Sequence, residues 1–569
     1  SSKAYVEQNP DIGGLEPFEH YLTRGWREGR SPTPSRHGPA HLWRAADAGT
    51  PTDWTHAPEA VPADPASVRR ALMRTSDESL RPLLETEFDA EFYLDSQRDV
   101  AESGRDPLEH YLTSGWREGR DPSRTFSIQD YLELNPDVAA AGMEPLTHYV
   151  VAGKAEGRPV RHELGFRHQV IAQLVPLHTR LEESRRFAAR AQVGDPAALA
   201  SALAESRGDN GALHVTVSHD NYMENVGGVQ LCIQREAAAI AGQGVDHLHL
   251  YPCCYWPVVR SVDDPAPVGV LWNGRDLGLF HPAAVSRVLR DRRAARPPGR
   301  LSFALHNMLG HGVADTVGML AAAGMERGHI WLHDFTSLCA GVHLLRNDVV
   351  DCAAPPETSG ACGVCVYGPF RRQHIELHEE LFGDLDLTVA APSQAAYDLW
   401  RRATTAPADQ PFVVHPHAVL TPRGPAAADE GPLKVAFLGM PAPHKGWPAF
   451  RALAERFADD PRYAFMHLGS TPVRGARVPF HQVAVSADDP LAMHDLVEAQ
   501  SVDVAVIWSL CRETFSFATY EAAAAGCAIL TGPDSGNVAA FVAETGLGRV
   551  LPGEAELEAL FESGEALEL

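Results

Sequence analysis

The chain has 569 residues, 44% of them hydrophobic, and a formal net charge of −25. This length accommodates three or four domains with a large core, and the acidic excess disfavours nucleic acid or an anionic membrane as the main partner. No run of about 18 apolar residues and no secretory signal is present, so we expect a cytoplasmic protein without a transmembrane segment.

One motif recurs three times in the N-terminal region. Its copies lie near 5–30, 93–120 and 131–158, and the last two are offset by 38 residues, from Tyr93 to Tyr131. Within each copy, a short helix around the tyrosine is expected to end near Asn-Pro-Asp, and a second helix begins at Pro-Leu or Pro-Phe. The period predicts a helical repeat domain over 1–160, available for protein–protein contact or oligomerisation. Recurrent His-Tyr pairs are explained by core packing at least as well as by ligand binding.

Two connecting segments flank the later copies. Residues 31–85 are rich in proline, alanine and polar residues, which predicts a partly ordered linker. Residues 161–206 carry a long helical pattern with several arginines and are expected to join the repeats to the rest of the chain. The alternative for this second segment is peripheral contact with the inner face of a membrane.

The region 211–425 begins with a strand, a Gly227-Gly228 turn and a helix. Glycines at such a turn let backbone amides approach an anion at a helix N-terminus. Leu301–Leu305 and Ile330–Leu332 are expected to be further buried strands. His306 and the His333-Asp334 pair follow these strands directly, and histidine can donate or accept a proton near neutral pH. The alternative for both histidines is a satisfied side chain at a strand end.

Four of the nine cysteines fall between 339 and 365. They are Cys339, Cys352, Cys362 and Cys365, the last two as Cys-x2-Cys. This number of thiols fits a closed tetrahedral structural zinc site. A disulfide pair and reduced buried thiols remain the alternatives, and disulfides are disfavoured in the cytosol.

The region 432–569 reads as strands alternating with helices. Strands are expected at Val435–Leu438, Ala464–Leu468, Val502–Trp508 and Ala528–Leu530, with helices at 446–458 and 490–500. Continuously apolar strands predict a parallel sheet covered on both faces, and such sheets bind ligands at the carboxyl ends of their strands. Gly439 and Lys445 follow the first strand, and Glu513 follows the third.

Glu513 and Glu521 enclose seven residues at the start of an Ala-rich helix that is expected to end at Gly526. Ionised carboxylates accept hydrogen bonds and match vicinal hydroxyls, which donate them. The alternative is that both glutamates lie on a solvated helix face.

This order of motifs resembles the retaining GT-B glycosyltransferases, family 4 in particular. The resemblance implies an α/β fold of two Rossmann-like domains facing a cleft, with an acceptor side at 211–425 and a nucleotide-sugar donor side at 432–569. It implies that Glu513 contacts the donor sugar and Glu521 the ribose, and that His333 and Asp334 face the sugar. The implied nucleotide-binding positions are Gly227, Gly228, Gly439, Lys445, Thr514, Phe515, Ser516 and Glu521.

Two positions depart from the family pattern. Met440 stands where many members have the arginine of a phosphate clamp, and His444 is a candidate substitute. Ser516 stands where the family often has glycine.

The resemblance implies transfer of a sugar, with retention of configuration, from a nucleotide diphosphate to a glycan, lipid-linked or protein acceptor in bacterial surface polysaccharide or glycoconjugate synthesis. No cofactor is expected for catalysis. A catalytically weakened scaffold and a nucleotide-sugar hydrolase or epimerase are the alternatives. The closing helix usual in GT-B folds is not evident before Leu569, so the sequence is expected to be a fragment of a longer protein.

Overall fold

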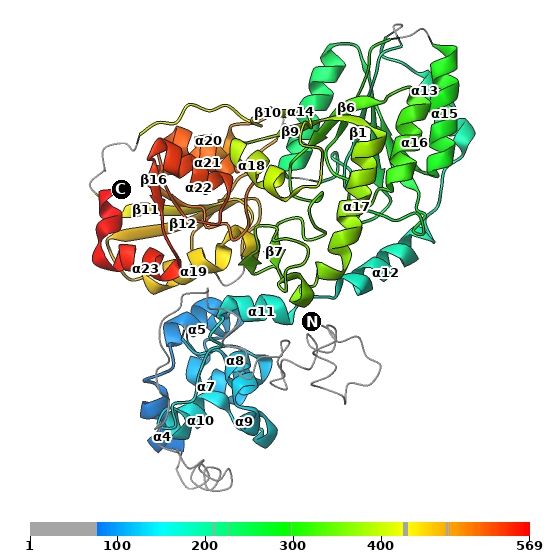
Figure 1. Ribbon diagram of the computed structural model, residues 1–569. Coiled ribbons are helices and arrows are strands. Elements are labelled where there is room, and N and C mark those ends of the chain that lie inside the picture. Colours follow the sequence, from blue (N-terminus) through cyan, green and yellow to red (C-terminus); the bar gives the residue numbers. More distant parts are fainter. Residues whose placement is uncertain are drawn as a thin grey trace.

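The computed structural model describes residues 77–569, except 124, 209–210, 226, 297–298, 425–430, 474–475, 477 and 487. The first motif copy and most of the expected linker 31–85 lie outside the described residues. Figure 1 shows a helical segment, blue to cyan, beside two lobes, one containing β1 and the other containing β11. Within the described part of the chain, no helix is both long and apolar enough to cross a bilayer.

The helical segment consists of α4 followed by two successive groups of short helices. Each group has three α-helices and a closing turn, where two helices were expected from the sequence. Proline occupies the first turn of α7, α9 and α10, where its missing N–H costs nothing. The elements are α4 (Asp77–Leu84), α5 (Ala90–Ser96), α6 (Arg98–Ser103), α7 (Pro107–Thr113), η4 (Gly115–Glu118), α8 (Ile128–Leu134), α9 (Pro136–Ala141), α10 (Pro145–His148) and η5 (Tyr149–Gly153).

The recurrent histidines of this segment make equivalent buried contacts. The Tyr93 hydroxyl lies 2.9 Å from His110 Nδ1, and the Tyr131 hydroxyl lies 2.7 Å from His148 Nδ1. A Cβ on Gly115 would lie 1.9 Å from the Tyr93 hydroxyl oxygen. These residues therefore form a packed core unit, which favours the packing interpretation of the histidines.

Residues 161–206 form separate helices instead of one long helix. These are α11 (Phe166–Ala172), α12 (Leu177–Ala188) and α13 (Pro196–Ala204). Prolines 176 and 196 separate them, because proline is excluded from a helix interior. Phe166 of α11 packs against the core of the β11 lobe, whereas Leu199 and Leu203 of α13 belong to the core of the β1 lobe. The segment is thus shared between the lobes.

The first lobe is built on an eight-stranded sheet in the order β10-β9-β6-β5-β1-β2-β3-β4. All of its pairings are parallel except those of β3, which is antiparallel to both neighbours. Its strands are β1 (Leu213–Val217), β2 (Asp246–Pro252), β3 (Val268–Trp272), β4 (Arg275–Phe280), β5 (Leu301–Leu305), β6 (Arg327–Trp331), β9 (Asp386–Ala391) and β10 (Phe412–Val414). Its helices, besides α13, are α14 (Gly228–Gly242), α15 (Pro282–Ala295), α16 (Val313–Ala323), α17 (Gly368–Asp384) and α18 (Gln394–Ala403).

The second lobe is built on a six-stranded parallel sheet in the order β13-β12-β11-β14-β15-β16. This is the doubly wound order in which the first strand lies centrally, beside the second and the fourth. Its strands are β11 (Leu433–Leu438), β12 (Tyr463–Gly469), β13 (Phe480–Gln482), β14 (Val504–Val506), β15 (Ala528–Thr531) and β16 (Gly548–Val550). Its helices are η7 (Pro443–Lys445), α19 (Trp447–Arg456), α20 (Ala492–Gln500), α21 (Phe517–Ala525), α22 (Asn537–Thr545), α23 (Glu554–Ser563) and η8 (Glu565–Glu568).

The central strand β11 shows why its sequence is apolar throughout. Val435 and Phe437 enter one core cluster, and Ala436 and Leu438 enter the cluster on the opposite face. Successive side chains of a strand point to opposite faces, so a sheet covered on both sides has no polar alternation. The predicted mixed α/β fold with two sheets of mainly parallel strands is confirmed.

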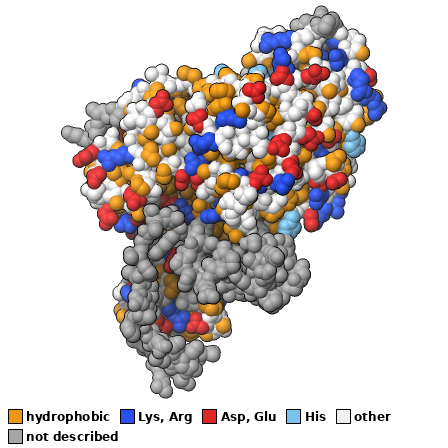
Figure 2. Space-filling view, in the orientation of Figure 1, with side chains coloured by type: hydrophobic (Ala, Val, Ile, Leu, Met, Phe, Trp, Pro, Cys, Tyr) orange, Lys and Arg blue, Asp and Glu red, His pale blue; other side chains and the backbone are white. Residues whose placement is uncertain are grey.

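The charges on the surface are mixed. Figure 2 shows acidic and basic side chains interspersed over the visible face of both lobes.

Candidate functional site

The candidate site lies where the second sheet changes winding direction, between β11 and β14. Ligands bind at this point in doubly wound folds, because the loops after the two strands diverge there. Lys445 follows β11, and Ser509 and Glu513 follow β14. Lys445 Nζ lies 2.7 Å from Glu513 Oε1, and the Ser509 hydroxyl donates to the same oxygen at 2.6 Å. The structure therefore brings together the predicted lysine and the first glutamate of the motif.

Gly446 allows the two loops to meet. Its φ is +83°, and a Cβ at this position would lie 2.0 Å from the Trp508 carbonyl oxygen. A side chain is therefore excluded by both backbone conformation and space. Gly439, with φ +99°, turns the chain directly after β11.

The Lys445–Glu513 pair is partly accessible. The Lys445 side chain is 36% exposed and that of Glu513 is 10% exposed. Burial alone would lower the pKa of Lys445, but the Glu513 carboxylate holds that pKa above its ordinary value. Conversely, burial would raise the pKa of Glu513, and the Lys445 ammonium holds it low. Both groups are charged at neutral pH, and an ammonium has three donors, so Lys445 can bind a further anion.

Glu521 is the unusual carboxylate of the site. It lies on α21, its side chain is buried with 5% exposure, and no described residue forms a hydrogen bond or ion pair with it. Burial raises the pKa of Glu521 to about 7, and the nearby Arg235 guanidinium opposes the shift. Buried carboxylates are normally paired, because an unpaired charge is costly in a low dielectric. Glu521 is therefore suited to accept hydrogen bonds from a ligand.

The loop between the glutamates is fixed against the first lobe. The Thr514 hydroxyl donates to the His333 carbonyl at 2.7 Å, and the Ser393 hydroxyl donates to the Thr514 carbonyl at 2.7 Å. Phe515 stacks on Tyr520 with ring centroids 4.5 Å apart. The side chains of Thr514 and Phe515 thus hold the loop, while Ser516 forms the N-cap residue of α21.

His333 belongs to a chain of three imidazoles. Its Nε2 lies 2.8 Å from His306 Nδ1, and its Nδ1 lies 3.1 Å from His417 Nε2. His306 Nε2 in turn lies 3.3 Å from Glu236 Oε2. Burial and the two neighbouring histidines lower the pKa of His333 well below its ordinary value, so this ring is neutral.

Glu236 lies at one end of this chain. Burial would raise its pKa, but His306 and His214 keep the pKa well below the ordinary value. An ionised carboxylate only accepts, so His306 donates to Glu236 from Nε2. Both nitrogens of His333 face neighbouring imidazoles, so its ring is held between His306 and His417 in this arrangement.

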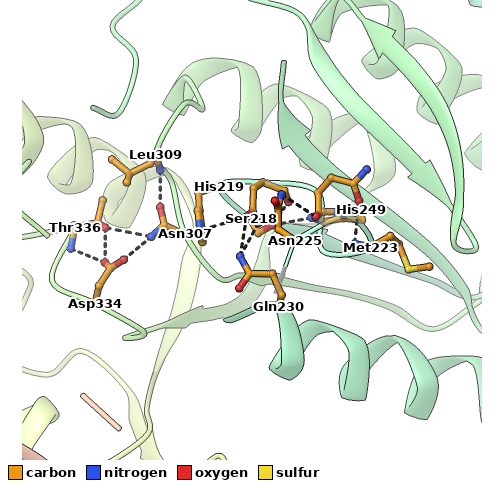
Figure 3. Close-up of polar contacts among 12 residues, drawn as sticks. Ser218, His219, Met223, Asn225, Gln230, His249, Asn307, Leu309, Asp334 and Thr336 are labelled. Atoms are coloured by element: carbon orange, nitrogen blue, oxygen red, sulfur yellow. Dashed lines mark hydrogen bonds and ion pairs between the residues drawn. The ribbon is translucent and has the colours of Figure 1, made fainter. Parts of the chain in front are cut away.

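Asp334 accepts hydrogen bonds from its own loop and from the loop after β5. Asn307 Nδ2 donates to Asp334 Oδ2 at 2.6 Å, and the Thr336 backbone N–H donates to Oδ1 at 2.8 Å. Figure 3 shows Asn307, Asp334 and Thr336 joined in this way, while Asn307 also accepts from the Leu309 backbone N–H. These contacts connect the loops after β5 and β6, which is a structural role for the carboxylate.

The Gly227-Gly228 turn lies against the glutamate motif. Gly227 is the N-cap residue of α14, and a Cβ on Gly228 would lie 3.4 Å from the Phe517 ring. Gln230, in the first turn of α14, donates to the Asp220 carboxylate at 2.7 Å. The N-terminus of α14 therefore lies beside the start of α21.

His444 does not supply the second cation expected of a phosphate clamp. Burial, the neighbouring His343 and Lys445 lower the pKa of His444 to about 3, so the ring is neutral. It stacks on His343 with centroids 4.7 Å apart. Met440 is 60% exposed and carries no charge.

A cavity of about 290 Å³ adjoins the site through His444. Residues from α11, α12, the first lobe and η7 line it, and its polar side chains are Arg180, Tyr255, His343, Asp348, Tyr367 and His444. Sequence reasoning missed most of these residues because they come from separate segments.

Arg235 was also missed by the sequence analysis. It lies on α14, donates to the His417 carbonyl at 3.0 Å and lies over the Phe517 ring. Its position seven residues after Gly228 places it two helical turns from the glycine turn, a spacing that could have drawn attention to it.

Two groups of side chains among the described residues have ligand atoms mutually within 4.8 Å, as a metal site requires. Cys232, His333 and His417 form one, but Arg235 lies close enough to His417 and Cys232 to affect both pKa values, which disfavours a cation there. His494, Asp495 and Glu498 form the other, on the surface. The four predicted zinc ligands belong to neither group, although all four line one cavity.

No family model and no curated protein matches the chain. Among solved structures, the pneumococcal O-GlcNAc transferase GtfA in complex with UDP and GlcNAc aligns at 9% identity and a TM-score of 0.39, over 62% of this chain and 92% of that one. Anabaena Alr3699/HepE in complex with UDP and glucose aligns at 12% identity and a TM-score of 0.36, over 62% and 89%. A GtfA/B complex aligns at 14% identity and a TM-score of 0.33 over 54% of this chain, which spans only 59% of that chain. Likeness at this level does not identify a family for the chain.

Proposed function

We propose that the protein is a retaining glycosyltransferase of GT-B type that uses a nucleotide-diphosphate sugar. Glu521 carries the proposal: it is a buried carboxylate with no hydrogen bond or ion pair among the described residues, at the ligand-binding edge of a doubly wound sheet. The ribose of a nucleotide offers two vicinal hydroxyls, which are the donors that such a carboxylate lacks.

The Lys445–Glu513 pair has complementary roles in this proposal. Lys445 offers a fixed positive charge to the diphosphate, and Glu513 both orients Lys445 and accepts from the sugar hydroxyls. Fixed charges aimed at a developing anion lower the barrier to its departure, because they need no reorganisation during the reaction.

In the reaction, the bond from the anomeric carbon to the phosphate oxygen breaks, and the nucleoside diphosphate leaves with the electron pair. The acceptor hydroxyl oxygen bonds to the anomeric carbon, and its proton passes to the departing diphosphate. A glycan-type acceptor would reach the donor through the cavity lined by Tyr255, Tyr367 and His444, which adjoins Lys445.

The experiment is a thermal-shift screen of the protein with UDP, GDP, dTDP and ADP and their common sugar conjugates. A ligand that binds the folded state alone raises the apparent melting temperature. We expect a rise with one base, smaller in Lys445→Ala and Glu521→Ala and unchanged in the control Lys154→Ala, which removes an exposed lysine of the helical segment.

The outcomes separate the alternatives. Binding with no transfer or hydrolysis would favour a scaffold, and release of free sugar without an acceptor would favour a hydrolase. No shift with any nucleotide would remove the donor-site assignment.

A further inference from the structure

The loop between β6 and α17 contains little regular structure for its length. Across residues 332–367 the structure has the two-residue strands β7 (Leu345–Arg346) and β8 (Val350–Asp351) and the short turn η6 (Cys362–Val364). Five non-glycine residues of this loop have positive φ, at Leu344, Asn347, Asp348, Ala353 and Ala354. Each such conformation costs of order 1 kcal/mol, so the surroundings must hold the loop in place.

Four cysteine side chains of this region converge on one cavity. Cys339, Cys352, Cys362 and Cys365 all line it, and its volume is about 20 Å³, room for one water-sized species. None of the four forms a disulfide. Residues separated by up to 26 positions thus present thiols to a single small space.

A buried cation faces the same cavity. Arg371 of α17 also lines it, is 5% exposed, and has its Nη1 3.0 Å from Cys362 Sγ. Its Nε donates to the Leu338 carbonyl at 3.3 Å, and no described carboxylate lies within 4.0 Å of its guanidinium. A buried charge without a counter-charge is strongly unfavourable, and the nearest groups that can become anionic are the thiols.

We propose that Cys339, Cys352, Cys362 and Cys365 bind one structural zinc ion that fixes this loop. Four thiolates are a complete tetrahedral set for zinc, and binding releases their four protons to solvent. The site then carries a net charge of −2, which the Arg371 guanidinium partly offsets. No three of the sulfurs form a group within 4.8 Å, so closing the site requires thiol side chains to rotate.

This proposal does not depend on the proposed glycosyl transfer. The zinc site would lie in the loop that carries His343 and Asp348 of the adjoining cavity, so the metal would hold that cavity in shape without touching substrate.

The test measures metal on the intact protein. Zinc content by mass spectrometry should be about one ion per chain, and cobalt(II) substitution should give the visible spectrum of a tetrahedral thiolate site. Zinc should fall to background in Cys362→Ser/Cys365→Ser. It should stay near one in Cys232→Ser, which changes the cysteine grouped with His333 and His417.

Arg371→Met keeps all four ligands and covers the case in which the double variant fails to fold. It should release zinc to a chelator severalfold faster than the unaltered protein, whereas Arg372→Met, on the exposed face of α17, should not. Three results would each overturn the proposal. The first is zinc-free protein with four titratable thiols, and the second is a disulfide among the four cysteines. The third is loss of zinc in Cys232→Ser with zinc retained in the double variant.

Discussion

At the residue scale, Glu521 links the stability of the protein to pH. Its carboxyl has a pKa of about 7 in the folded protein against 4.5 for an ordinary glutamate. Between these values the native state binds more protons than the unfolded state. The stabilising effect is therefore complete below about pH 4.5 and is lost as the pH rises through 7.

We predict that Glu521→Gln removes this pH dependence. The unaltered protein should lose up to about 3 kcal/mol of unfolding free energy between pH 5 and pH 8, and the variant should not lose it. The difference between a pKa of about 7 and one of 4.5 corresponds to that energy. Urea unfolding at the two pH values measures it. If the unfolding free energies of both proteins change equally between the two pH values, Glu521 is not the titrating group.

Nucleotide affinity should have the opposite pH dependence. Only the ionised carboxylate accepts two hydroxyl donors, so affinity in the unaltered protein should fall as the pH drops below 7. Calorimetric titration at pH 6 and 8 measures this, and Glu521→Gln should bind weakly at both.

Glu513 should affect turnover more than binding. Glu513→Gln keeps the shape of the side chain but removes the charge that orients Lys445. We expect transfer to fall by about 10²–10³-fold with nucleotide affinity little changed, as for loss of a group that acts mainly in the transition state. Matched losses of affinity and rate would assign Glu513 to ground-state binding.

At the element scale, single glycines decide whether segments can pack. We predict that Gly446→Ala costs more than about 3 kcal/mol of unfolding free energy, because its Cβ would collide with the Trp508 carbonyl at positive φ. Gly318→Ala is the control: Gly318 lies inside α16 with no atom near the added Cβ, so alanine should stabilise by about 0.5–1 kcal/mol. Denaturant midpoints compare the two.

The helical segment allows a rescue experiment. Gly115→Ala should destabilise this segment, since its Cβ would overlap the Tyr93 hydroxyl. Tyr93→Phe removes that oxygen, so the double variant should lose less than the sum of the two single changes. Additive losses, measured by proteolysis of the segment, would place the strain elsewhere.

At the scale of the whole molecule, the region 161–206 decides where the two-lobed part of the chain begins. A protein starting at residue 161 retains α11, whose Arg167 pairs with Glu554 at 2.6 Å, and α13, whose Leu199 and Leu203 fill the first-lobe core. We predict that it folds and binds nucleotide. A protein starting at residue 211 loses two buried leucines, about 2–5 kcal/mol each, and should be unstable or aggregate. Equal melting temperatures for both would contradict this.

The sequence by itself determined the local features. The apolar strand Ala528–Leu530 follows from burial on two faces, and the helix end at Gly526 follows from its positive φ, which nearest neighbours encode. Pro176 and Pro196, which separate the helices of 161–206, are visible in the sequence. The helical pattern around them nevertheless predicted one long helical segment.

Tertiary structure decided which side chains meet. Three contacts join segments from 27 to 286 residues apart: the imidazole chain that engages both nitrogens of His333, the pairing of Lys445 with Glu513, and the approach of Arg235 to Glu521. No local pattern encodes such contacts, because they arise only when strand order brings the carboxyl ends of distant strands to one edge. The sequence thus determined the elements and the chemical groups, and the packing of two sheets decided which groups face each other.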